Sequence, residues 1–252
     1  MVSSRLVVFL MICEGMLYKT TQFKNPIYVG DPLNTVKIFN DLEVDELVIV
    51  DASKGNSDID YALLDELASV SRMPICYGGK VRTKEQFQRI VAMGFEKVLI
   101  NTEAIINPSL IRSVSGIFGK QSVVVGIDVY KNAKSGRYDV YTHCGTQKNA
   151  ASLSEIVQKS VESGAGEILI NNIFCDGMET GYDTNLLRKV SLICPVPLTF
   201  LGGLSSLKDI QLASNEFGPI GIAGSSLFIF KGKFKAVLPH YIDYTLKLEL
   251  LS

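Results

Sequence analysis

The chain has 252 residues, of which 47% are hydrophobic and 20% are charged, and its formal net charge is −1 with two histidines. This length and composition predict one folded domain with a large core, and they exclude an intrinsically disordered chain. A nucleic-acid-binding function is not expected, because it requires an excess or a stripe of basic residues.

The five cysteines are scattered and form no CxxC pair, a pattern typical of reduced thiols, so we expect a cytoplasmic protein. No second pair of ligands completes a zinc tetrahedron, and we expect neither a metal nor a cofactor. The apolar run 6–13 resembles a weak signal peptide. However, it is short and lacks a small-residue cleavage site, and it fits a buried parallel strand better. No run approaches the roughly 20 apolar residues of a membrane span.

Short apolar runs alternate along the chain with amphipathic stretches. Predicted strands cover residues 5–10, 46–51, 74–78, 97–101, 122–128, 167–171, 197–201 and 219–223. Predicted helices cover residues 34–42, 60–71, 83–93, 108–117, 152–163, 184–192, 206–214 and 233–248. Eight such units in this length predict a closed α/β barrel, the (βα)8 or TIM barrel, rather than the alternative of an open doubly wound sheet.

The two halves of the chain resemble each other at a spacing near 120 residues. The matching segments are 6–11 with 123–128, 45–51 with 165–172, 75–79 with 199–203, and 99–102 with 221–224. We therefore predict a single domain, residues 1–252, built from half-barrel repeats at about 1–120 and 121–252.

In this fold, function resides at the carboxyl ends of the strands. The predicted strand ends and the loops after them are polar, with Asp51, Asn101, Thr102, Asp128, Asn171, Asn172, Asp176 and Ser225. Each of these could be a turn or cap residue, but together they exceed what capping requires. Asp128 is the best general acid/base candidate. Its repeat counterpart is Met11, where a symmetric barrel would present a second carboxylate.

Glycines after the last two strands are typical of a phosphate site, because they let backbone N–H groups approach the anion. These segments are Gly202-Gly203 and Gly224-Ser225, and simple turn glycines are the alternative. The repeat puts Gly78-Gly79 and Asn101-Thr102 in the corresponding place. This predicts a second phosphate site and a ligand with a phosphate at each end. Lys80 follows the glycines there and either helps or obstructs.

Four charged residues stand immediately before the apolar runs of predicted strands: Arg5, Glu46, Lys97 and Glu167. Two cations and two anions at this end could form a ring at the barrel floor. By composition alone, a salt-bridged plug or a solvated rim is the favoured interpretation.

Together these residues resemble the cyclase subunit of imidazole glycerol phosphate synthase, the HisF family, over nearly the whole chain. The most specific stretches are Lys19, Gly30-Asp31-Pro32 and segments 45–47, 100–104, 124–128, 164–169, 176–177 and 181–183. The resemblance implies a heterodimer with a glutaminase that docks at the amino-terminal face of the barrel. It also implies that ammonia enters through a gate made of Arg5, Glu46, Lys97 and Glu167.

The resemblance further implies that ammonia reacts with a bisphosphorylated ribulosyl aminoimidazole intermediate, PRFAR. The products would be imidazole glycerol phosphate and an aminoimidazole ribotide, AICAR. Asp128 would act as the general acid/base. Lys19, as a loop residue, would contact the substrate together with Asp51, Asn101, Thr102 and Asp176. The phosphate contacts would come from Gly78, Gly79, Gly202, Gly203, Gly224 and Ser225.

Two departures from the family pattern keep an alternative open. Met11 stands where the family has its first catalytic carboxylate, and Lys80 stands where it has a glycine. A branch with this combination occurs in surface-polysaccharide gene sets, where it is associated with passing ammonia to a sugar-amidating enzyme. The hypotheses are therefore a cyclase, an ammonia-conducting subunit without cyclase turnover, and a phosphate-binding scaffold. The gate residues argue against the scaffold.

Overall fold

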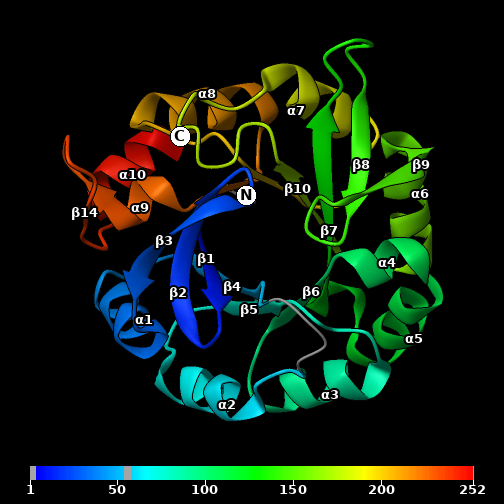
Figure 1. Ribbon diagram of the computed structural model, residues 1–252, viewed down its shortest axis with the longest axis horizontal. Helices are drawn as coiled ribbons and strands as arrows, with labels where there is room; N and C mark the ends of the chain where they lie inside the picture. Colours follow the sequence, from blue (N-terminus) through cyan, green and yellow to red (C-terminus); the bar gives the residue numbers. More distant parts are fainter. Residues whose placement is uncertain (1–3, 54–57, 252) are drawn as a thin grey trace.

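The computed structural model describes residues 4–53 and 58–251, which form a closed barrel of parallel strands surrounded by helices (Figure 1). Within these residues the barrel strands are β1 (Arg5–Cys13), β4 (Glu46–Asp51), β5 (Ile75–Gly78), β6 (Lys97–Ile100), β7 (Val123–Lys131), β10 (Glu167–Asn172), β11 (Leu198–Leu201) and β12 (Gly221–Gly224). β12 pairs with β1 and β7 pairs with β10, so the sheet closes on itself. The predicted (βα)8 barrel is confirmed.

Helices between the strands cover the outside of the barrel. They are α1 (Pro32–Asp41), α2 (Tyr61–Val70), α3 (Lys84–Ala92), α4 (Thr102–Ile106), α5 (Ser109–Phe118), the 3₁₀ turn η1 (Lys120–Ser122), α6 (Leu153–Ser163), α7 (Thr184–Ser191), α8 (Leu207–Phe217), α9 (Ser226–Ile229) and α10 (Tyr244–Leu251). Asp31 caps α1 by accepting a hydrogen bond from the Asn34 N–H at 2.8 Å. Ser152 and Glu155 form a capping box at the start of α6.

Alternation along each strand divides the core into two parts. Outward-facing side chains such as Leu47 and Ile49 of β4 pack in the large cluster between sheet and helices. Inward-facing side chains such as Val48 meet their counterparts on the other strands at the barrel axis. The strand runs are nearly continuous in apolar residues because both faces of the sheet are buried.

Two antiparallel extensions were not predicted from the sequence. β1 continues into β2 (Met16–Thr21) and β3 (Lys24–Gly30), and β7 continues into β8 (Tyr138–Thr142) and β9 (Gln147–Ser152). Lys19, expected in a loop, therefore lies in strand β2. Tyr138–Thr142 does alternate between buried and less buried residues. β3 and β9 are largely exposed and carry little apolar pattern.

The predicted terminal helix 233–248 is wrong over its first half. Residues 230–237 form a small hairpin of β13 (Phe230–Lys231) and β14 (Ala236–Val237), and α10 begins only at Tyr244. Pro239 stops a helix here, because it has no N–H to donate and restricts the residue before it. The backbone instead bonds to the preceding segment, with Leu238 N donating to Ile229 O and His240 N to Phe228 O.

The register of the repeat also differs from the sequence alignment at two strands. Glu46 of β4 and Glu167 of β10 hold equivalent positions at the starts of their strands, so Val50 and Asn171, each four residues further on, are also equivalent. Val50 pairs with Gly78 of β5, and Asn171 pairs with Leu201 of β11. Gly78 therefore corresponds to Leu201, Gly79 to Gly202, and Lys80 to Gly203. Gly78 pairs with Leu99 of β6. Its counterpart Leu201 lies two residues after Thr199, which pairs with Gly221 of β12, so Leu99 corresponds to Ala223 and Asn101 to Ser225. Apolar strand sequences can be aligned with each other at several offsets, and only the strand pairing in the structure shows which offset is correct.

No helix within the described residues is long and apolar enough to cross a membrane.

Candidate active site and charged ring

The barrel interior is layered from floor to mouth. The first residues of four strands form the floor, and the next inward positions form an apolar layer of Val7, Val48, Cys76, Leu99, Val124, Leu169, Leu201 and Ala223. Further along, the inward positions become polar, with Asn101, Asp128 and Asn171. A charged floor and a polar mouth are thus separated by one apolar layer on a common axis.

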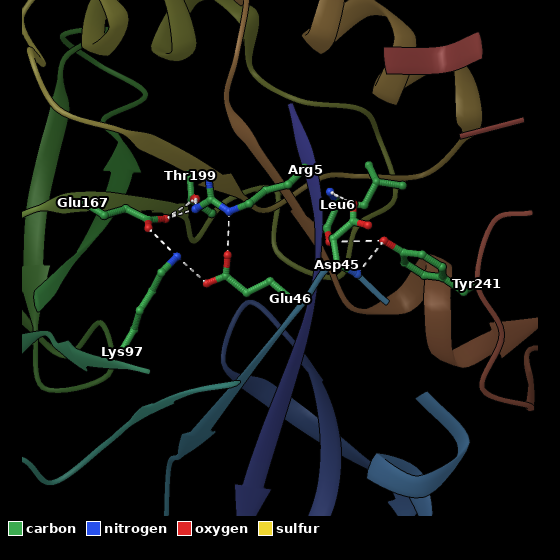
Figure 2. Close-up of polar contacts among 8 residues, drawn as sticks. All are labelled: Arg5, Leu6, Asp45, Glu46, Lys97, Glu167, Thr199 and Tyr241. Carbon is green, nitrogen blue, oxygen red and sulfur yellow. Dashed lines mark hydrogen bonds and ion pairs between the residues drawn. The ribbon is translucent and has the colours of Figure 1, made fainter. Parts of the chain in front are cut away.

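The four charged residues of the floor are brought together into a closed ring (Figure 2). Arg5 bridges Glu46 and Glu167 through its guanidinium group. Lys97 bridges the same two carboxylates from the other side, with Nζ 2.8 Å from Glu46 Oε1 and 2.9 Å from Glu167 Oε2. Every charge in this ring has two partners of opposite sign.

The ring residues are only partly accessible, with side-chain exposures of 28% for Arg5 and 22% for Lys97. Burial disfavours charge on both cations, but the attraction of Glu167 and Glu46 is stronger and raises the pKa of each above its usual value. Both cations therefore keep their charge beside the two carboxylates.

Thr199 is a fifth member of the ring that the sequence interpretation missed. Its hydroxyl donates to Glu167 Oε1 and accepts from the Arg5 guanidinium at 3.1 Å. The available signal was its position two residues before Leu201, which faces inward on the same strand. A second polar network ties the floor to the carboxyl terminus, where Asp45 accepts from Leu6 N at 3.0 Å and pairs with Lys247 (Figure 2 shows its contacts with Leu6 and Tyr241).

Asp128 lies at the mouth end of β7 and is almost fully buried. Its two carboxylate oxygens accept hydrogen bonds from Asn101 Nδ2 at 3.0 Å and Asn171 Nδ2 at 2.8 Å. Burial raises the pKa of Asp128 to about 6, although the two amides favour the ionised form. This carboxyl group can therefore both hold and release a proton near neutral pH.

Asn171 was noted as a polar strand end but not assigned to the site. Its Nδ2 is bound to Asp128, and its buried Oδ1 has no hydrogen-bond partner among the described residues. An unpaired buried acceptor beside the acid/base candidate is a place for a donor group of a ligand.

Met11 occupies the position on β1 that corresponds to Asp128 on β7. It pairs with Val50 of β4 and with Tyr18 of β2 and is half-buried. A thioether neither donates nor accepts a proton in this pH range. The described mouth therefore has one carboxyl group at these two equivalent positions.

The predicted phosphate segments of the second half lie around one pocket. Its lining includes Gly202, Gly203, Gly224, Ser225 and, from the loop after β10 and from β2, Asp176 and Lys19. Lys19 Nζ lies 2.9 Å from Asp176 Oδ1, and both side chains are nearly buried. Gly203 has φ +110°, and a Cβ there would lie 2.1 Å from the Gly181 carbonyl oxygen. The backbone can pass this close to Gly181 only because the residue is glycine.

The corresponding segments of the first half have a different environment. Gly79 has φ +102°, and a Cβ there would lie 2.2 Å from the Asp51 carbonyl oxygen. Lys80 has φ +60°, and its Nζ lies 2.9 Å from Asp51 Oδ2. Thr102 donates to Asn101 Oδ1 and accepts from His143 N. Asp51, expected to orient a substrate, is thus held by Lys80 and by Ser53 N.

Residues 13–235 match the family described as histidine biosynthesis protein. The chain belongs to this family of (βα)8 barrels. A relative in Leptospira borgpetersenii, named "Putative imidazole glycerol phosphate synthase subunit HisF", is 43% identical over 97% of both chains. This identity over nearly the full length of both chains places the chain among the HisF subunits.

Two relatives come from one organism, Vibrio vulnificus. The "Putative imidazole glycerol phosphate synthase subunit hisF3" is 42% identical and covers 96% of this chain and 94% of its own length. The "Imidazole glycerol phosphate synthase subunit hisF1" is 32% identical and covers 90% and 91%. One genome therefore holds two HisF relatives, and this chain is more similar to hisF3.

Proposed function

We propose that this chain is the cyclase subunit of an imidazole glycerol phosphate synthase that receives ammonia from a glutaminase docked at the amino-terminal face of the barrel. The observation that carries the proposal is the common axis of the charged ring and Asp128, separated by the apolar layer. In this proposal the reaction converts PRFAR to imidazole glycerol phosphate and AICAR.

Ammonia enters at the ring of Arg5, Glu46, Lys97 and Glu167. The ion pairs of the ring must separate for ammonia to pass. Each cation contacts both glutamates, so one contact can open while the other remains, and this arrangement supports such an exchange. Beyond the ring, the apolar layer favours neutral ammonia over ammonium, because an unpaired ion is costly to desolvate. Thr199 keeps Glu167 and Arg5 aligned while contacts exchange.

At the mouth, the pocket of Gly202, Gly203, Gly224 and Ser225 binds one phosphate of the substrate. Lys19 and Asp176 border that pocket and position the ligand. Asp128 transfers the proton as ammonia adds and the imidazole ring closes. Asn101 and Asn171 hold its carboxylate, and the free Asn171 Oδ1 accepts from the substrate. We assign Asp51 and Thr102, with Gly78 and Gly79, to the opposite side of the mouth.

A second candidate function is favoured by Met11 and by the greater similarity to hisF3 than to hisF1. Loss of one acid/base group typically costs about 10²–10⁴-fold in rate. In this second proposal the barrel conducts ammonia without cyclase turnover and delivers it to a separate enzyme that amidates a sugar in surface-polysaccharide synthesis.

The deciding experiment measures PRFAR consumption by the purified chain with saturating ammonium salt and no glutaminase. Turnover that Asp128→Asn abolishes supports the cyclase. If the wild-type chain has no turnover and Met11→Asp restores some, the conducting role is favoured. Ser225→Ala, at the phosphate pocket, separates a binding defect from a chemical one, because it should raise KM and leave kcat less affected.

A further inference from the structure

Three aromatic side chains form a cluster at the mouth of the barrel. Tyr130 packs edge-to-face against Phe174, with ring centroids 5.9 Å apart, and against Tyr141, with ring centroids 6.2 Å apart. Tyr130 belongs to β7, Tyr141 to β8, and Phe174 to the loop after β10. We call these three residues the mouth aromatic cluster.

Strand pairing puts this cluster on the same face as Asp128. Tyr141 stands directly opposite Asp128 in the antiparallel pair of β7 and β8, and directly opposite residues project to the same side. Tyr130 follows Asp128 by two positions on β7, and alternate residues of a strand also share a face. The other face of this ribbon, with Val129 and Val140, is buried in the large core cluster between sheet and helices. The aromatic rings therefore lie beyond Asp128 along β7, on the side that faces the mouth.

Phe174 is fixed by its backbone but leaves its ring accessible. Its N–H donates to Asn172 Oδ1 at 3.1 Å, and its carbonyl oxygen accepts from Gln22 Nε2 at 2.7 Å. Even so, 51% of Phe174 and 37% of Tyr130 are exposed. Aromatic rings held in this way offer apolar surface that a second planar ring can cover by stacking, at a low cost in conformational entropy.

We infer that the mouth aromatic cluster is the stacking site for the planar aminoimidazole ring of the ligand, and that Phe174 and Tyr130 determine specificity for that ring. This inference rests on the proposed cyclase function and names the part of the substrate that this side of the mouth receives. Asp176, which borders the phosphate pocket, follows Phe174 by two residues, so a ligand with its phosphate in that pocket can lay its ring against the cluster. Asn171 Oδ1, buried and without a hydrogen-bond partner among the described residues, is available beside Asp128 to accept from an N–H group of the ring substituents.

The test compares the binding of AICAR with that of ribose 5-phosphate, which has the same sugar phosphate without the ring, by calorimetry of the full chain. Stacking on an aromatic side chain contributes about 10-fold in affinity, so the wild type should bind AICAR at least that much more tightly. Phe174→Leu keeps an apolar side chain and removes the ring. It should weaken AICAR binding about 10-fold and leave ribose 5-phosphate binding unchanged, and Tyr130→Leu should have the same selective effect.

Phe234→Leu is the matched control, because Phe234 lies in the turn between β13 and β14, is 92% exposed and is no part of the cluster. It should leave both affinities unchanged. NMR of the wild type gives a second readout that needs no substitution. AICAR should shift the ring-proton signals of Phe174 and Tyr130, and ribose 5-phosphate should not.

Equal affinity for the two compounds in the wild type, or an unchanged AICAR affinity in Phe174→Leu, would overturn the inference. If neither compound shifts the amide signals of Gly203 and Ser225, the proposed phosphate pocket is contradicted instead. The free ring compound 5-aminoimidazole-4-carboxamide then tests the cluster by itself, and unchanged Phe174 and Tyr130 signals in its presence would overturn the stacking site. Changes of these signals on dilution without ligand would assign the cluster to a contact between copies of the chain, which also overturns it.

Discussion

Asn171 donates a hydrogen bond from its Nδ2 to Asp128 Oδ1 at 2.8 Å, across two neighbouring strands of the barrel mouth. The bond favours the carboxylate, yet burial still raises the pKa of Asp128 from 3.8 to about 6. The pair therefore combines a fixed orientation with a proton affinity suited to transfer near neutral pH.

The raised pKa of Asp128 predicts how stability changes with pH. Between pH 4 and 6 the folded state binds a proton that the unfolded state releases, so the free energy of unfolding falls as pH rises through this window. A shift of about two units corresponds to roughly 3 kcal/mol. Urea unfolding from pH 4 to 7 should show this loss in the wild type.

Asp128→Asn provides the control for that measurement, because it keeps the shape and removes the titration. The difference in unfolding free energy between wild type and variant should change by about 3 kcal/mol across the window and be constant above pH 7. A pH-independent difference would contradict the raised pKa.

Lys97→Met should weaken the coupling between glutamine hydrolysis by the glutaminase and product formation in the barrel. It leaves Glu46 and Glu167 with Arg5 as their remaining cation in the ring, so the gate loses its balanced charge. We expect glutamine-driven product formation to fall about 10-fold or more, equivalent to about 1.4 kcal/mol, while ammonium-driven formation changes less. The assay compares the two nitrogen sources in the presence of the glutaminase.

Lys208→Met, on an exposed part of α8, is the control for loss of a lysine and should leave both rates unchanged. Unaltered glutamine-driven flux in Lys97→Met would exclude the ring as the gate.

Gly203→Ala should destabilise the fold and weaken the phosphate pocket together. The added Cβ would meet Gly181 O at 2.1 Å in a backbone region that L-residues disfavour, and we expect a loss of about 2 kcal/mol or more. Gly232→Ala separates the two causes. Gly232 also has positive φ, but nothing lies within 4 Å of the added Cβ, so only about 1 kcal/mol should be lost. Equal losses in urea unfolding would show that the close approach to Gly181 has no cost.

Lys80→Ala should cost about 3 kcal/mol in unfolding free energy, because it leaves the buried Asp51 carboxylate without its cation. Lys80→Gly should be less destabilising by about 1 kcal/mol, since glycine adopts φ +60° without strain. Chemical denaturation of both variants measures the difference. If alanine proved as stable as glycine, the strain at this position would be refuted.

The sequence alone determined the barrel, its strand order and the four floor charges, because these depend on local periodicity and on the residue that begins each strand. Arg5, Glu46, Lys97 and Glu167 all begin strands, so a closed parallel sheet gathers them at one end whatever the details of packing. Asp128 was likewise predicted from its place at a strand end.

Tertiary structure alone decided which groups meet across the mouth. The pairings of Lys80 with Asp51, Lys19 with Asp176 and Asn171 with Asp128 join residues on different strands or loops. They depend on the stagger between strands, which apolar strand sequences leave undetermined because they match at several offsets. The same stagger makes Lys80, rather than Gly79, the counterpart of Gly203. The extensions after β1 and β7 and the late start of α10 depended on long-range backbone bonds that local patterns do not encode.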